Sequence, residues 1–321
     1  MKFVLAPLAD FTDAPFRRLA FECGADVSCT EMVSAAALAH GHSPTHQLLE
    51  TMPGEGPVVC QLFAASEGDL AVAVRETAGH GFVALDLNAG CPMPNVTRCG
   101  AGAKLMEDPK KIGRLLRVMK ENTDLPVTLK TRIGPHPGNA GIFEILDEAV
   151  SAGVSGIAVH ARYTSQKHGG PIHLDVLREV TERSPVPVTG NGGVRTIADA
   201  RAMAETGVSA IMVGRGALGN PGIFAELKRG LGLPSDRAAG ESTGRIELCR
   251  RHLEYILAFR EQLLKKFSSD HVPSVDGYAS VKMHTHLFRY FSGLPGAAAL
   301  RARLNSIRTL AEIREAMSSV A

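Results

Sequence analysis

Short apolar runs, many of them β-branched, recur through the first two thirds of the chain, and longer segments with helical periodicity lie between them. An apolar run of this kind is typical of a strand buried on both faces, as in a parallel sheet. Strands and helices that alternate in this way predict a sheet with helices packed against it. The expected strands are residues 3–6, 27–30, 58–63, 82–87, 127–131, 156–160, 186–190 and 210–213.

Helix start signals support the same alternation. Ser66 stands three residues before Asp69, the spacing of a capping box, and Asp108 precedes Pro109, a pair typical of a helix start. Eight strand–helix repeats favour a (β/α)₈ TIM barrel over an open doubly wound sheet, which usually has fewer strands.

The pattern changes after residue 230. A polar linker of small residues at 233–242 is followed by apolar residues at helical spacing, such as Leu253, Ile256 and Leu263. The chain is therefore expected to divide into a barrel domain, 1–239, and a smaller all-α helical domain, 240–321. Later helices of this second domain are expected over 275–291, 297–304 and 310–317.

Basic charge is concentrated in the last part of the chain, from Arg245 onward, which is called the tail below. The net charge of the 321 residues is only +2, which by itself demands no nucleic-acid partner. From Arg245 onward, however, 12 Lys and Arg stand against 7 Asp and Glu. A solvated helix face normally mixes signs, so an acid-free basic stretch at 277–310 is a candidate contact surface for nucleic acid. Its cations are Lys282, Arg289, Arg301, Arg303 and Arg308.

The cysteines and the apolar segments exclude several classes of protein. The six cysteines form no CxxC pair and have no ordered spacing, which predicts neither a zinc site nor a disulfide framework. No signal peptide is visible, and no stretch approaches the roughly 18 apolar residues of a membrane span. We therefore expect a cytoplasmic protein with reduced thiols, no bound metal and no membrane contact, and no protein partner is evident.

Polar side chains follow the expected strands at their carboxyl ends, where barrel enzymes hold their chemistry. Asn88 and Cys91 follow the run 82–87, and Gly90 and Pro92 hold the thiol in a tight turn. A turn favours an accessible, titratable sulfur over an inert buried one. The other strand ends carry Gln61, Lys130, His160 with Arg162, Asn191, and Gly214 with Arg215.

Lys130 and two glycine-rich loops indicate an anionic cofactor. A lysine that points into a barrel mouth is costly unless it meets an acidic partner or an anionic ligand. His160 ends its strand in the same way, where it is either a structural histidine or a site residue. Glycines at 190–193 and 214–216 let backbone N–H groups approach a phosphate after strands seven and eight. Together they suit flavin mononucleotide (FMN), whose reduced ring is an anion.

Several of these motifs together resemble one enzyme family. The most specific is Asn88-Ala89-Gly90-Cys91-Pro92, followed by Gly-Ala-Gly-Ala at 100–103. Supporting motifs lie at 6–10, 31–33, 61–63, 130–132, 159–162, 190–192, 214–216 and 291–297. With these motifs, nearly the whole chain resembles the tRNA-dihydrouridine synthases.

The resemblance implies a chemistry. It implies an FMN enzyme that reduces the C5–C6 double bond of particular uridines in tRNA, with electrons from NADPH. Hydride would pass from flavin N5 to C6, and Cys91 would protonate C5 as general acid. A thiol suits this role because its ordinary pKa of about 8.5 keeps it protonated at neutral pH.

The resemblance also implies roles for individual residues. Asn88 would hold the uracil, and the basic residues of the tail and of the loop after strand six would contact tRNA. The expected cofactor residues are Ala6, Pro7, Gln61, Lys130, His160, Asn191, Gly192, Gly214 and Arg215, and the expected substrate contacts are Asn88, Arg162, Lys282 and Arg289.

Departures and alternatives accompany this interpretation. Lys104 stands where the family usually has a small residue, Ala161 stands where Gly is common, and the loop 162–170 is more basic than the family pattern. An FMN barrel that reduces a free pyrimidine or small enone, as dihydroorotate-type dehydrogenases do, would share the fold, but the basic tail argues against it. A catalytically silent tRNA-binding barrel is disfavoured by the intact Cys91, Lys130 and His160.

Overall fold

The computed structural model describes residues 1–139, 141–234, 243–293, 304 and 306–319. Eight parallel strands close into a barrel, because β1 pairs with both β2 and β9, and β2 pairs with β4. A two-residue strand, β3 (Val33–Ser34), adds to β4. The barrel strands are β1 (Lys2–Leu5), β2 (Val27–Cys29), β4 (Val58–Phe63), β5 (Ala84–Ala89), β6 (Val127–Arg132), β7 (Gly156–His160), β8 (Val188–Asn191) and β9 (Ala210–Val213). The predicted (β/α)₈ barrel is confirmed.

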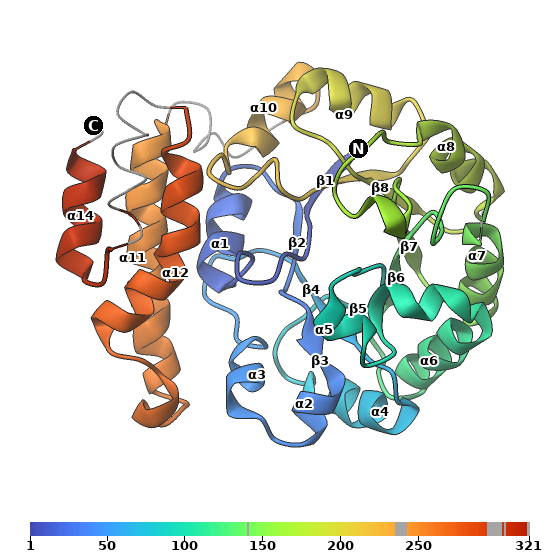
Figure 1. The fold of residues 1–321 in the computed structure, drawn as a ribbon, viewed down its shortest axis with the longest axis horizontal. Coiled ribbons are helices and arrows are strands. Elements are labelled where there is room, and N and C mark those ends of the chain that lie inside the picture. The colour runs from blue at the N-terminus through green and yellow to red at the C-terminus, as the bar shows by residue number, and fades with distance from the viewer. Residues whose placement is uncertain (140, 235–242, 294–303, 305, 320–321) are drawn as a thin grey trace.

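Helices surround the barrel (Figure 1). Both predicted start residues cap their helices: the Ser66 side chain accepts a hydrogen bond from the Asp69 N–H, which is one half of the expected capping box, and Asp108 caps the helix that begins at Pro109. The helices are α1 (Ala14–Glu22), α2 (Ala35–Ala39), α3 (Ser43–Gln47), α4 (Glu67–Glu76), α5 (Pro94–Thr97), α6 (Pro109–Glu121), α7 (Ile142–Ser151), α8 (Leu174–Arg183), α9 (Ile197–Ala204) and α10 (Ile223–Gly230), with short 3₁₀ helices η1 (Gly102–Glu107) and η2 (Thr164–Gln166).

Two strands begin two residues later than the apolar runs predict. β8 begins at Val188 and not at residue 186, because Pro187 has no N–H for the strand ladder. β5 covers 84–89 where 82–87 was expected, so Asn88 is the penultimate strand residue. This shift places Cys91 two residues beyond the end of its strand.

The tail is helical, with α11 (Arg245–Leu264), a 3₁₀ turn η4 (Ser269–His271), α12 (Val275–Tyr290) and α14 (Leu310–Ser318). The helices expected over 275–291 and 310–317 are confirmed. The helix expected over 297–304 lies almost wholly outside the described residues, as does the expected domain boundary between 239 and 240. None of the described helices is long and apolar enough to cross a membrane.

The tail packs directly on α1 of the barrel (Figure 1). A second apolar cluster joins Leu19 of α1 and Cys23, the residue just after α1, to Ile256 of α11 and Met283 of α12. All four side chains are fully buried. The barrel and tail therefore share a continuous apolar seam.

One glycine permits a close approach at this seam. Gly219, in the loop after β9, has a φ of +73°, and a Cβ there would lie 2.3 Å from the carbonyl carbon of Arg289 on α12. No side chain fits at that distance. α12 therefore rests directly on the backbone of a loop at the carboxyl end of the barrel.

Two buried histidines in the seam make its stability depend on pH. His252 and His286 form an edge-to-face pair with ring centroids 4.5 Å apart, and His252 Nε2 and His286 Nδ1 have no hydrogen-bond partner. Burial lowers the pKa of both, that of His286 to about 4 from its ordinary 6.5. The native state therefore holds both histidines neutral.

Because the unfolded chain takes up protons on these residues first, we expect stability to fall as pH drops from about 6.5 towards 4. The expected loss is roughly 2–3 kcal/mol for His286 alone. Urea unfolding at several pH values measures it. A His286→Phe variant should show a flatter pH dependence, and a variant of the exposed His284 to Gln should match the wild type. Equal slopes for wild type and His286→Phe would contradict the prediction.

Candidate active site

A cavity of about 410 Å³ lies at the carboxyl ends of the barrel strands. Its walls come from the loops after six strands and from α12 of the tail. The structure brings most of the predicted site residues together there. These are Ala6, Pro7, Asn88, Cys91, Lys130, His160, Arg162, Asn191, Gly192, Gly214, Arg215 and Arg289.

The turn that carries Cys91 is built by Asn88. The Oδ1 atom of Asn88 accepts hydrogen bonds from the N–H groups of Gly90 at 3.1 Å and Cys91 at 3.0 Å. The Nε atom of Arg132 donates to the Gly90 carbonyl at 2.7 Å. Partial burial raises the pKa of the Cys91 thiol above its ordinary value. The thiol is thus fixed in the cavity wall and protonated at neutral pH.

Gln61 lies behind this wall and does not line the cavity. It is fully buried, its Nε2 donates to Asp86 Oδ2 at 2.7 Å, and its Oε1 accepts from Asn88 Nδ2 at 2.8 Å. Asp86 in turn accepts from the Thr128 hydroxyl at 2.6 Å. This chain of side chains fixes which way the Asn88 carboxamide points, so the structure gives Gln61 an orienting position and no direct contact with the cavity.

Lys130 is a half-buried cation that pairs with no carboxylate of the described residues. Its Nζ donates to Asn191 Oδ1 at 3.3 Å, and no ion pair of Lys130 occurs among the described residues. Burial and the nearby Arg132 lower its pKa to about 8. Asn191 is itself held by a 2.8 Å bond from its Nδ2 to the Met212 carbonyl. The arrangement leaves the Lys130 charge available to an anionic ligand.

His160 faces the same space as a neutral ring. It is buried, and desolvation together with the surrounding cations lowers its pKa well below 6.5. Its Nε2 lies 3.4 Å from Arg162 Nη1, and its ring stacks on that of His168 with centroids 6.5 Å apart. A neutral imidazole here can donate or accept one hydrogen bond without adding charge.

The loops after β8 and β9 require their glycines. Gly192 has a φ of +125°, and a Cβ there would lie 2.8 Å from the His160 ring. A Cβ on Gly216 would lie 2.4 Å from the Val194 carbonyl oxygen. Arg195 and Arg215 line the cavity beside these loops, and partial burial together with the nearby Arg195 and Arg289 lowers the pKa of Arg215. Glycine backbone and arginine side chains together suit a phosphate group.

Some residues that line the cavity were not predicted from the sequence as site residues. Arg132, the last residue of β6, ties the loops after β5 and β7 together, because besides the Gly90 carbonyl it donates to the carbonyls of Tyr163 at 3.3 Å and Lys167 at 2.8 Å. It stands two residues after Lys130 on the same strand, so the period of 2 in strands was a usable signal. His168 and Arg195, which also line the cavity, come from loops and carried no such signal.

The two predicted tail residues lie in different places. Arg289 lines the cavity. Lys282, about two helical turns earlier on α12, lies outside it, with its Nζ 3.6 Å from Asp13 Oδ2 and 4.0 Å from Glu31 Oε1. Lys282 is therefore engaged with barrel carboxylates at the seam.

A basic, glycine-walled cavity at the carboxyl ends of a closed parallel barrel places the chain among the (β/α)₈-barrel enzymes. The family model described as "Dihydrouridine synthase (Dus)" matches residues 4–320. The chain belongs to this family and is a flavin-dependent oxidoreductase. The resemblance found in the sequence is thereby confirmed.

Several named proteins are similar in sequence to this chain over most of its length. It is 28% identical, over 96% of its own length and 82% of the relative's, to a probable tRNA-dihydrouridine synthase 1 of Synechocystis sp.. The chain is 30% identical to a probable tRNA-dihydrouridine synthase of Rhodobacter capsulatus, over 98% of its own length and 94% of the relative's. It is 31% identical to tRNA-dihydrouridine synthase B of Klebsiella pneumoniae, with 71% of each chain covered. A crystal structure of mandelate oxidase with benzoyl-formic acid is similar at a TM-score of 0.48 and 22% identity, over 73% of this chain and 74% of that one.

Proposed function

We propose that this protein reduces specific uridines of tRNA to 5,6-dihydrouridine, with bound FMN as cofactor and NADPH as reductant. The observation that carries the proposal is the placement of the Cys91 thiol and the unpaired Lys130 ammonium in one cavity. The family membership and the names of the relatives support tRNA as the substrate.

The residues present fit a flavin with a single phosphate. The glycine loops at 192–193 and 214–216 can accept the phosphate, with Arg215 beside it, and Lys130 supplies a positive charge deeper in the cavity. Bound FMN would supply hydride from its N5 atom to C6 of the uracil. Ala6 and Pro7 would contact the cofactor from the loop after β1, and His160 as a neutral hydrogen-bonding group.

Cys91 would donate the proton to C5. Its raised pKa keeps the sulfur protonated at neutral pH, which is the form that a general acid requires. Asn88 holds the turn so that the thiol faces the cavity, and the remaining N–H of its carboxamide can meet a uracil carbonyl.

A uridine in folded tRNA must leave its stack to reach this cavity, and backbone contacts elsewhere must offset that cost. Arginines that can make such backbone contacts line the cavity. Arg162 and Arg289 lie in its wall, and Arg289 comes from the tail. We therefore assign RNA contacts to Arg289 and Arg162 and not to the ion-paired Lys282.

The proposal predicts the behaviour of the purified protein. It should be yellow and release FMN, not FAD, on denaturation, because the cavity offers one phosphate site. NADPH should bleach the flavin under anaerobic conditions, and unmodified tRNA should restore the colour with formation of dihydrouridine. NADH and already modified tRNA serve as controls. Bound FAD, or reoxidation by a free pyrimidine but not by tRNA, would contradict the proposal.

A further inference from the structure

The loop between β1 and α1 forms one wall of the cavity and contains a residue in an unfavourable backbone conformation. Residues 6–11 line the cavity. Within them Asp10 has a φ of +66°, a left-handed value that few residues other than glycine adopt. Such a conformation persists only where its surroundings hold it.

Glu31, which follows β2, holds this residue in place. Its Oε2 atom accepts a hydrogen bond from the Asp10 N–H at 2.6 Å. Glu31 is only 6% exposed, and its other oxygen, Oε1, has no hydrogen-bond partner. A buried carboxylate with one unbonded oxygen needs a nearby cation to remain charged.

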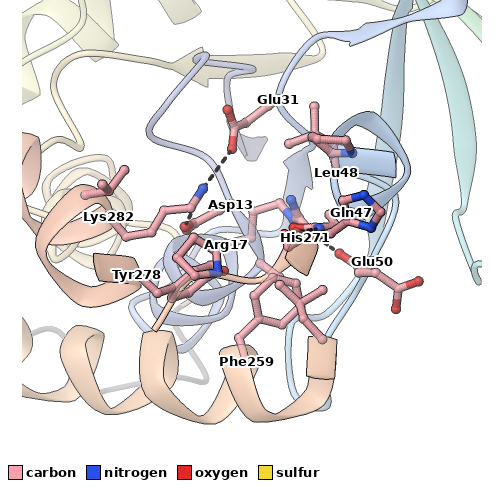
Figure 2. Close-up of a pocket in the computed structure, with 15 residues that line it drawn as sticks. Asp13, Arg17, Glu31, Gln47, Leu48, Glu50, Phe259, His271, Tyr278 and Lys282 are labelled. Carbon is pink, nitrogen blue, oxygen red and sulfur yellow. Dashed lines mark hydrogen bonds and ion pairs between the residues drawn. The ribbon is translucent and has the colours of Figure 1, made fainter. Parts of the chain in front are cut away.

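The tail provides that cation. Figure 2 shows the Lys282 amine of α12 pointing between Asp13 and Glu31, at 3.6 Å and 4.0 Å respectively. The two carboxylates raise the pKa of Lys282, and Lys282 opposes the rise that burial causes in the pKa of Glu31. Asp13 also caps α1 by accepting from the Phe16 N–H at 3.2 Å.

Other contacts of α12 reach the same loops. The ring of His286 packs edge-on against that of Phe11, the last of the loop residues that line the cavity, with centroids 5.3 Å apart. Arg289 rests on Gly219 after β9 and lines the cavity itself. α12 thus touches loops on two sides of the cavity.

From these contacts we propose that Glu31 and Lys282 are positioning residues for the cofactor wall: Lys282 of the tail keeps Glu31 charged, and Glu31 holds Asp10 and its loop in the shape that receives the flavin. The ligand named here rests on the proposed function, whereas the loop geometry does not. The tail then acts in cofactor binding as well as in RNA binding.

Hydrogen–deuterium exchange of the full-length protein tests directly whether Lys282, acting through Glu31, holds the loop around Asp10. We call this pair of contacts the relay. Lys282→Met keeps the apolar stem of the side chain and removes its charge, so Glu31 becomes a neutral, weaker acceptor. Exchange in peptides covering residues 7–12 should become about tenfold faster, as expected when a charge-assisted hydrogen bond is weakened. FMN should bind more weakly, with an altered absorption band, when it is titrated into the apoprotein.

Lys266→Met is the matched control. Lys266 pairs with the buried Glu50 across the same seam at 2.5 Å, but neither residue lines the catalytic cavity. This variant should leave both the exchange at 7–12 and FMN binding unchanged.

Four results are decisive. Unchanged exchange at 7–12 in Lys282→Met would overturn the relay. A uniform increase in exchange across the whole seam would overturn it too, since Lys282 would then stabilise the seam as a whole and not this loop in particular. Faster exchange with unaltered FMN binding would overturn its role in the cofactor wall. Absence of FMN binding by the wild type would contradict the proposed function instead, and the exchange comparison would still decide the relay.

Discussion

Replacing Cys91 with alanine is expected to lower dihydrouridine formation by roughly a hundredfold or more, because it removes the general acid from the cavity. Flavin binding and flavin reduction by NADPH should remain nearly unchanged, since the thiol contributes no charge at neutral pH. Single-turnover measurements separate the two half-reactions: bleaching of the flavin by NADPH, and its reoxidation by tRNA.

Cys99→Ala is the control for this substitution. Cys99 is exposed, lies outside the cavity and donates only to the Asn95 carbonyl at 3.4 Å. Its replacement should leave both half-reactions as they are. If Cys99→Ala slowed reoxidation and Cys91→Ala did not, the assignment of the acid would be wrong.

Lys130→Ala should slow flavin reduction by roughly 10² and weaken FMN binding, because a preorganised charge beside the developing anion is lost. The pH dependence gives a second readout. Burial lowers the pKa of Lys130 to about 8, so above that pH FMN must recruit a proton to it on binding. FMN affinity of the wild type should therefore fall between pH 7 and pH 9, whereas that of Lys130→Ala should stay level.

Lys104→Ala is the matched control for Lys130. Lys104 is exposed on η1, and its Nζ pairs with Glu107 at 2.6 Å. This variant should bind and reduce flavin like the wild type. Unchanged flavin content and reduction rate in Lys130→Ala would place the ring away from Lys130.

The barrel was predictable from sequence because strands buried on both faces must be continuously apolar. Their limits were less so, since proline and local pairing decide where a ladder begins, as at Pro187. The strand-end positions of Asn88, Lys130 and His160 led correctly to the cavity wall. Gln61 also lies near the carboxyl end of its strand, but it pairs in register with Asp86 behind the cavity wall. The periodicity of a strand does not tell whether such a side chain faces the cavity or lies behind its wall.

Lys282 shows a different limit. An acid-free basic stretch such as 277–310 suggests a surface for RNA, yet the carboxylates that meet Lys282 are Asp13 and Glu31, which lie far away in the sequence. Arg289 belongs to the same basic stretch and does reach the cavity. Local charge pattern therefore identifies the helix, and only the tertiary packing tells which of its cations are free to bind a ligand.

The contact between Gly219 and Arg289 bears on how such enzymes could be retargeted. Exchanging tails between relatives is an obvious route to a new modification site, because the tail looks like an appended module. In this protein the backbone of α12 lies against a cavity loop with no room for a single methyl group. A donor tail would need its own versions of the loops at 6–13 and 214–219, so the transplantable unit is the helix together with those loops.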